Sequence, residues 1–321
     1  MTNIRQNPRT PDAADNPNSI AAATSATTVQ NLLHEVPRIW DFLHPGSLGS
    51  LLTTNRSFRH AVHTFVTTIH IVHKSQHTKA PQAEVAELLM RGSWVRLMHL
   101  KLSLSYGWRE AKLSKDVMSL LVRLPRLNLR SLDLSRTKLG ADAMSVLVKA
   151  DWPSLTMLDL TGTGLVPAGM RELVAASWMT LQHLQSLNLS NNNLRGEALE
   201  MLIDGNWACL TSFSLASNFS KGEELQREAV VYLCRAEIVQ LQSLNLAGSW
   251  LQTEAVPHLS LALWPQLQHL NLSDTWLSTE GLAQLEITDL HQLRSLDLSK
   301  NHFDHQAVEH LQLSLDGELQ F

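Results

Sequence analysis

Histidine is the residue type in this chain best suited to hold a metal ion, because five histidines gather near the N-terminus. They form two His-x-x-His pairs, a spacing used in zinc sites: His60, His63, His70, His73 and His77. Residues 67–72 have the pattern of a strand, in which His70 and His73 would point to opposite faces. We therefore favour ordinary surface histidines over a zinc site, and we expect neither a metal nor a cofactor.

The two cysteines, Cys209 and Cys234, are too few for a disulfide framework. Both fall at expected core positions of the repeats described below, so small buried side chains are favoured over catalytic thiols. The sequence also lacks a phosphate-binding Gly-rich loop and a nucleophile elbow. The chain is therefore not expected to be an enzyme.

The charge pattern argues against nucleic acid or an anionic membrane as the main partner, because the formal net charge is −4 and no block of like charges occurs. No apolar stretch approaches the roughly 20 residues that span a bilayer. Residues 1–28 lack the apolar segment of a signal peptide and are expected to form a disordered arm. Together with the two cysteines, this predicts a cytoplasmic or nuclear protein.

A Leu-x-x-Leu-x-Leu unit organises most of the chain, as in "LRSLDLS" and "LTMLDLT". Its apolar alternation is typical of a short strand. A weaker ninth unit contains Val66, Ile69 and Ile71. The first leucine of the eight clear units recurs every 26 to 32 residues, at Leu97, Leu129, Leu155, Leu184, Leu210, Leu241, Leu267 and Leu293.

Apolar residues change to helical spacing after each strand, for example at Leu139, Ala143, Met144 and Leu147. This motif and period resemble the leucine-rich-repeat family in its long, ribonuclease-inhibitor-like form. The resemblance covers residues 66–321 and implies an α/β horseshoe, with one parallel sheet of nine strands on the concave face and helices on the convex face. In the family, a polar residue after each strand bonds to the turning backbone; here that column reads Thr137, Thr163, Asn192, Asn218, Ser249, Thr275 and Asn301.

Tryptophan recurs in phase with the repeat, three residues before the first leucine, at Trp94, Trp152, Trp207 and Trp264, and Trp178 precedes Leu181 likewise. We favour a buried spine between helix and strand over the alternative of an exposed aromatic platform, because large aromatics repeated in register usually fill core volume.

Residues 29–65 break the repeat and resemble an F-box. The spacing of Pro45, Leu48, Leu51 and Phe58 after Leu43 matches that family, although "LLHE" replaces its opening Leu-Pro-x-Glu. The alternative is a small helical cap over the apolar end of the first repeat. The resemblance implies contacts with the adaptor subunit of a cullin-type ubiquitin ligase through Leu32, Leu33, Ile39, Phe42, Leu43, Pro45, Leu48 and Leu51.

The concave face should carry the strand residues that lie between the inward leucines. Small residues from Ser103 to Ser299 run beside them, so the expected groove is small-residued and weakly acidic. The candidate contacts for a protein partner on this face are His99, Lys101, Asp133, Asp159, Asn188, Asn245, His269, Asn271 and Asp297.

Trp250 and Trp276 occupy the same repeat position, 26 residues apart, which should bring them together on the loop edge of the horseshoe. Two tryptophans on such an edge suggest an interface, and the alternative is that both rings fold back over the core.

These observations predict a protein–protein interaction module. It is expected to be the substrate-recognition subunit of a cullin-type ubiquitin ligase; the alternative is a free-standing repeat scaffold or inhibitor-type binding protein with a helical cap.

Overall fold

The computed structural model describes the chain over residues 67–72, 85–86, 89–90, 94, 96–103, 112–124, 128–175, 183–194, 196–205, 207–218, 225–251, 255–259, 262, 264–286, 293–303 and 318–320. The predicted arm (1–28) and the F-box-like segment (29–65) lie outside the described residues, as does Trp178.

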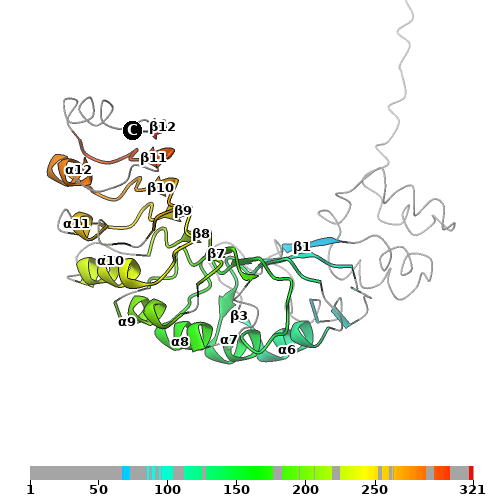
Figure 1. Cartoon of the computed structure of the whole chain (residues 1–321). Coiled ribbons are helices and arrows are strands. Elements are labelled where there is room, and N and C mark those ends of the chain that lie inside the picture. The colour runs from blue at the N-terminus through cyan, green and yellow to red at the C-terminus, as the bar shows by residue number, and fades with distance from the viewer. Residues whose placement is uncertain are drawn as a thin grey trace, which may run out of the picture.

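A single parallel sheet lines the inner face of a curved solenoid (Figure 1). The nine expected strands are present, and a tenth, β12, continues the sheet. The sequence pattern did not reveal β12, because Asp316 and Phe321 stand where the first and third leucines of the motif would be. In spatial order the strands are β1 (Thr68–Val72), β2 (His99–Ser103), β4 (Ser131–Asp133), β6 (Met157–Asp159), β7 (Ser186–Asn188), β8 (Ser212–Ser214), β9 (Ser243–Asn245), β10 (His269–Asn271), β11 (Ser295–Asp297) and β12 (Glu318–Gln320).

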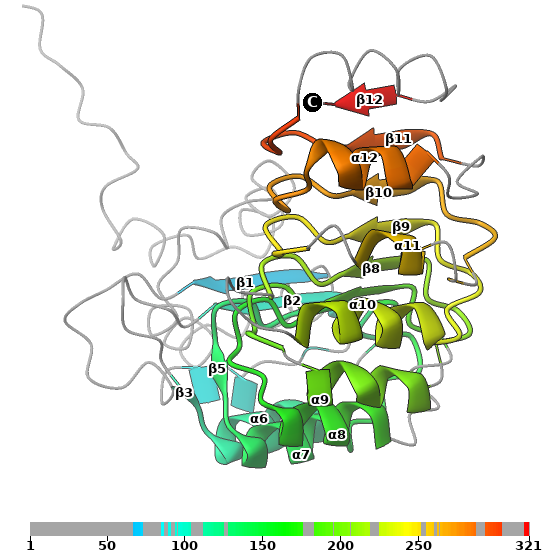
Figure 2. The ribbon, with the colours of Figure 1, turned by 90° about the vertical axis from the view of Figure 1, so that its left-hand side faces the viewer.

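Helices cover the outer face of the sheet, as Figures 1 and 2 show from two sides. Helix α6 begins after Ser114, whose hydroxyl accepts a hydrogen bond from Val117 N, and it ends with Arg123 in its last turn. Two-residue strands β3 (Lys112–Leu113) and β5 (Lys138–Leu139) pair beside the main sheet. The described helices are α6 (Lys115–Arg123), α7 (Ala141–Leu147), α8 (Pro167–Ala175), α9 (Gly196–Glu200), the 3₁₀ helix η3 (Met201–Asp204), α10 (Leu225–Arg235), α11 (Val256–Leu259) and α12 (Thr279–Glu286).

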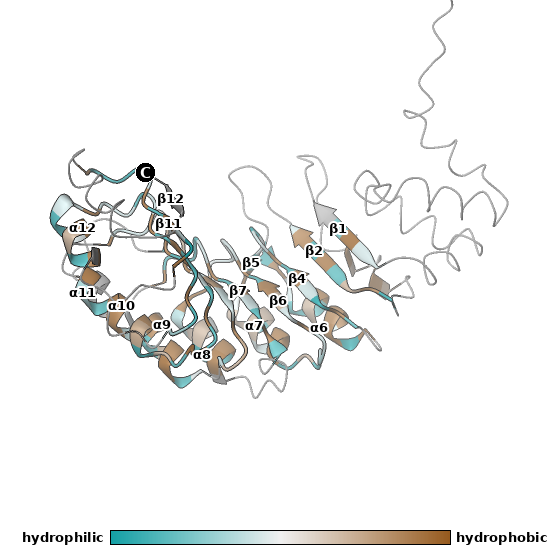
Figure 3. Cartoon of the chain, turned by 45° about the horizontal axis from the view of Figure 1, so that its top comes forward, coloured by the Kyte–Doolittle hydropathy of each residue, from teal (hydrophilic) through white to brown (hydrophobic). Residues whose placement is uncertain are grey.

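The core lies between the sheet and the helices. The repeated leucines of the strands and the helix residues Ala143, Met144 and Leu147 are buried in one continuous cluster. The helices carry both hydrophobic and hydrophilic residues, as expected for elements with one covered face (Figure 3). The α/β solenoid predicted from the repeat is therefore confirmed, with helices outside and a parallel sheet inside.

The tryptophan column forms the predicted buried spine, since Trp94, Trp152, Trp207 and Trp264 are all buried. The indole nitrogens of Trp94 and Trp207 donate to carbonyls five residues earlier, Leu89 O at 3.1 Å and Leu202 O at 2.7 Å. Among the described residues, Trp264 Nε1 has no such acceptor. Its preceding helix, α11, has only four residues.

The polar column after the strands holds neighbouring repeats together. Asn192 Oδ1 accepts hydrogen bonds from Thr163 N and Leu165 N, and its Nδ2 donates to Leu160 O and Leu189 O. Asn218 and Asn301 make the equivalent bonds in their repeats. Where the column holds Thr or Ser, a hydroxyl donates to a carbonyl instead, as Thr137 does to Leu102. The buried turns are thus satisfied by the side chains that the sequence indicated.

Candidate protein-binding surface

One row of residues crosses the concave face in backbone register from strand to strand. Backbone pairing aligns the third residue of each strand with its neighbour, from His70 and Lys101 at one end to Asp297 and Gln320 at the other. Every intervening strand contributes one polar residue to this concave row: Asp133, Asp159, Asn188, Ser214, Asn245 and Asn271. The structure therefore gathers the predicted candidates of this row on one surface, including Lys101 and Asp297.

Six members of the concave row also hold the turn that follows their own strand. In each, one side-chain oxygen accepts a hydrogen bond from the backbone N–H two residues later, at 2.8 to 3.0 Å. These six are Asp133, Asp159, Asn188, Asn245, Asn271 and Asp297. In Asn188 and Asn271 the same oxygen also accepts a hydrogen bond from the serine hydroxyl two residues later.

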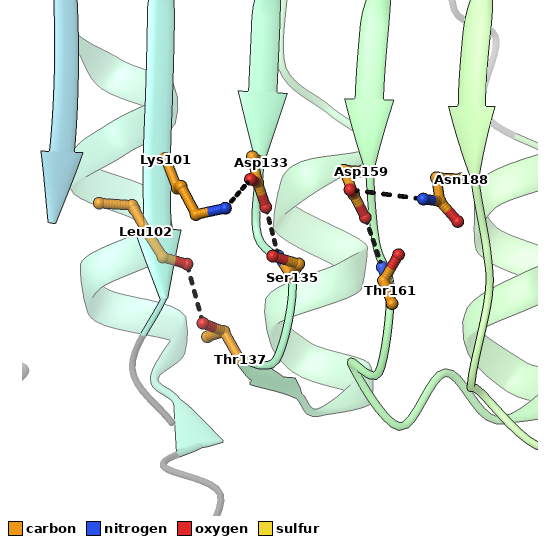
Figure 4. A network of polar contacts seen from close by, with 8 residues as sticks. All are labelled: Lys101, Leu102, Asp133, Ser135, Thr137, Asp159, Thr161 and Asn188. Carbon is orange, nitrogen blue, oxygen red and sulfur yellow. Dashed lines mark hydrogen bonds and ion pairs between the residues drawn. The ribbon is translucent and has the colours of Figure 1, made fainter. Parts of the chain in front are cut away.

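The N-terminal end of the concave row contains two separate groups of polar contacts, one around Asp133 and one around Asp159 (Figure 4). Lys101 Nζ forms an ion pair with Asp133 Oδ2 at 2.5 Å, and Asn188 Nδ2 donates to Asp159 Oδ2 at 3.5 Å. Partial burial alone would raise the pKa of Asp133, but hydrogen bonds from Lys101 and Ser135 outweigh it and lower the pKa. Asp133 is thus an ionised, partnered carboxylate at neutral pH.

A second row lies beside the first, at the opening residue of each strand. His99 belongs to it, between Thr68 and Ser131, and so does His269, between Ser243 and Ser295. His269 is exposed, and so is Met157, which the sequence analysis did not single out. The sequence could have indicated Met157, because both neighbouring strands hold a serine at the same repeat position, Ser131 and Ser186.

Trp250 and Trp276 stack on the loop edge, the turns that follow the strands. Their ring centroids are 4.4 Å apart and their planes differ by 26°. The stack continues to His302, whose ring centroid lies 5.0 Å from that of Trp276 at a tilt of 57°. The predicted juxtaposition of the two tryptophans is present, and the third member was missed although His302 occupies the same repeat position. We call Trp250, Trp276 and His302 the aromatic stack.

The two cysteines differ in burial, and four of the five clustered histidines lie outside the described residues. Cys234 is buried, and burial raises the pKa of its thiol to about 12. Cys209 is exposed, so its predicted core position was wrong. It lies in the turn between buried Trp207 and Leu210, where the apolar period is interrupted. Of the five clustered histidines only His70 is described, and it is exposed on β1.

Among the described residues, no group of three or more His, Cys, Asp or Glu side chains is placed to hold a metal ion. No helix among them is long and apolar enough to cross a membrane.

A family model described as "Leucine Rich repeat" matches residues 180–202 and 265–285, the segments that include β7 and β10. No curated protein matches the chain. The chain is similar to the solved structure of LegL7, a leucine-rich repeat-containing protein from Legionella pneumophila, with 17% identity over 84% of this chain and 75% of that one and a TM-score of 0.49.

Two further similar structures are InlP and a Rad7 complex. InlP from Listeria monocytogenes is 15% identical over 85% of this chain and 66% of its own, with a TM-score of 0.48. A structure of the Rad7 and Elc1 complex in yeast is 14% identical over 90% of this chain and 92% of that one, with a TM-score of 0.37. The repeated strand–turn–helix unit, rather than these distant likenesses, carries the assignment of the fold.

Proposed function

We propose that this chain, a leucine-rich-repeat solenoid, is a protein-binding subunit that holds a partner protein on its repeats. The observation that carries the proposal is the concave row, which runs in register across ten parallel strands. A sheet holds such side chains about 4.8 Å apart from strand to strand, so an extended partner surface can be matched at many points. The chain would act as a receptor, without catalysis, in the cytoplasm or nucleus.

We further propose that residues 29–65 bind the adaptor subunit of a cullin-type ubiquitin ligase, which would make the repeat partner a substrate for ubiquitination. The support is the F-box-like spacing from Leu43 to Phe58, placed directly before the first repeat. An apolar helical patch at one end and a long repeat surface at the other would join two proteins. The chemistry would then be supplied by other subunits.

Substitution of the F-box-like leucines tests this pairing. Leu43→Asp and Leu48→Asp should each weaken binding of the purified adaptor to the full-length chain at least about 100-fold, because each places a charge in an apolar interface. Isothermal titration calorimetry provides the measurement. Val166→Asp is the matched control, since Val166 is 53% exposed and belongs to a later repeat of the sequence.

The melting temperature of each variant shows whether the repeats stay folded. If Leu43→Asp and Leu48→Asp bind the adaptor as tightly as the native chain, the segment does not form the interface. If they instead lower the melting temperature by several degrees, these leucines cap the first repeat and the free-standing scaffold is the better description.

A further inference from the structure

The aromatic stack lies in the strongly acidic part of the solenoid. Residues 236–321 contain 11 Asp and Glu but only two Lys and Arg, giving a formal charge of −9, whereas residues 1–235 carry +5. Two of the acidic residues are exposed close to the stack in sequence, Asp274 two residues before Trp276 and Glu280 in the first turn of α12. The cationic residues of this part are Arg294 and Lys300, and Lys300 is exposed two residues before His302 of the stack.

Trp276 combines exposure with a backbone conformation that is unfavourable for it. Its φ is +61°, in the left-handed region, and its side chain remains 48% exposed. The same repeat position is also left-handed in two other repeats, where it holds Gly164 (φ +66°) and Asn193 (φ +54°), the residue types that tolerate this conformation. Fold stability would favour Gly or Asn here. Strain and exposed apolar surface at one residue are typical of a binding site.

We infer that the aromatic stack, together with the exposed carboxylates of Asp274 and Glu280, forms the docking site for an arginine-bearing segment of the partner protein. This inference rests on the proposed protein-binding function. An indole attracts a cation through its negative π surface, and a guanidinium also packs against aromatic rings because it is planar and weakly hydrated. The surplus of carboxylates raises the local concentration of basic segments and repels nucleic acid and anionic membranes.

The test uses fluorescein-labelled peptides of four Arg-Gly, Lys-Gly or Glu-Gly repeats, titrated with the full-length chain at low salt and followed by fluorescence anisotropy. We expect Arg-Gly to bind more tightly than Lys-Gly, and Glu-Gly not to bind. Trp276→Asn should weaken Arg-Gly binding about tenfold. This variant places at Trp276 the residue type that Asn193 provides in another repeat, so the left-handed turn is retained and the melting temperature should not fall.

Two further variants separate the contributions of ring and charge. Val239→Asn is the matched control, because Val239 is 43% exposed but lies outside the stack, and its Arg-Gly affinity should equal that of the native chain. Asp274→Asn should weaken binding about threefold and reduce its salt dependence, with the turn preserved because Asn tolerates the φ of +53° found there.

The inference is overturned if the native chain does not bind the Arg-Gly peptide, if Glu-Gly binds equally well, or if a folded Trp276→Asn variant keeps native affinity. Adaptor binding is measured on the same samples. Loss of adaptor binding with intact peptide binding would remove the ubiquitin-ligase role alone. Intact adaptor binding without peptide binding would remove only the docking site.

Discussion

Polar side chains in this protein form hydrogen bonds with backbone groups both in the buried turns and on the half-exposed concave surface. Asn192, with 5% exposure, is committed to the turns of its own and a neighbouring repeat. Asp133 lies on the concave surface, where one oxygen bonds Ser135 N and the other meets Lys101. Buried polar groups such as that of Asn192 therefore hold the fold, whereas half-exposed ones such as that of Asp133 remain partly available to a partner.

Lys101→Met tests the electrostatics of the concave row. The pKa of Asp133 should rise, because burial then acts without the opposing hydrogen bond and charge of Lys101. A carboxyl whose folded pKa is depressed contributes stability above its unfolded pKa of about 3.9, and that contribution is lost as the pH falls through the folded value. The stability difference between native and variant chains should therefore be largest near neutral pH and disappear in acid.

Carbon-detected NMR titration of Asp133 measures this change directly, and urea midpoints at several pH values measure its effect on stability. Arg171→Met provides the control, because Arg171 forms an exposed ion pair with Glu197 on the outer face. An unchanged pKa of Asp133 in Lys101→Met would show that the ion pair is not populated in solution.

The strand–turn–helix unit was predictable from sequence because its contacts repeat at a fixed period. Leucine spacing indicated the strands, and the in-phase tryptophans indicated the spine that packs helix against strand. Departures occur where the period weakens: Cys209 follows the spine tryptophan in an exposed turn, and β12 retains only Leu319 of the motif's three leucines. The continuation of the aromatic stack to His302 depends on ring geometry that spacing does not specify.

Asn192→Ala tests the turn network at the element scale. The substitution leaves Thr163 N, Leu165 N, Leu160 O and Leu189 O without their side-chain partner inside the protein. We expect a loss of about 2–4 kcal/mol in the free energy of unfolding, because buried polar groups lose their hydrogen bonds. Chemical denaturation followed by circular dichroism provides the measurement.

Glu200→Ala is a suitable control for that measurement, since Glu200 is exposed at the end of α9. Its effect should stay within about 0.5 kcal/mol. A cost for Asn192→Ala below about 1 kcal/mol would mean that the leucine core alone fixes the turns.

At the scale of the whole molecule, charged residues and candidate binding segments are distributed unevenly along the chain. The acidic residues concentrate toward the C-terminal repeats, which also carry the aromatic stack, while the F-box-like segment precedes the first repeat. The sequence indicated the concave residues because strand alternation determines which side chains face outward. It could not indicate which of their atoms were already occupied, since the turn hydrogen bonds depend on the folded backbone.

The most direct test of the proposed receptor role is the mass of the complex formed by the full-length chain and the purified adaptor subunit. Size-exclusion chromatography with multi-angle light scattering gives that mass without labels. The proposal predicts one co-eluting species whose mass equals this chain of 35.9 kDa plus one adaptor. Separate elution of the two proteins, each at its own mass at concentrations of about 10 μM, where a micromolar complex would persist, would contradict it.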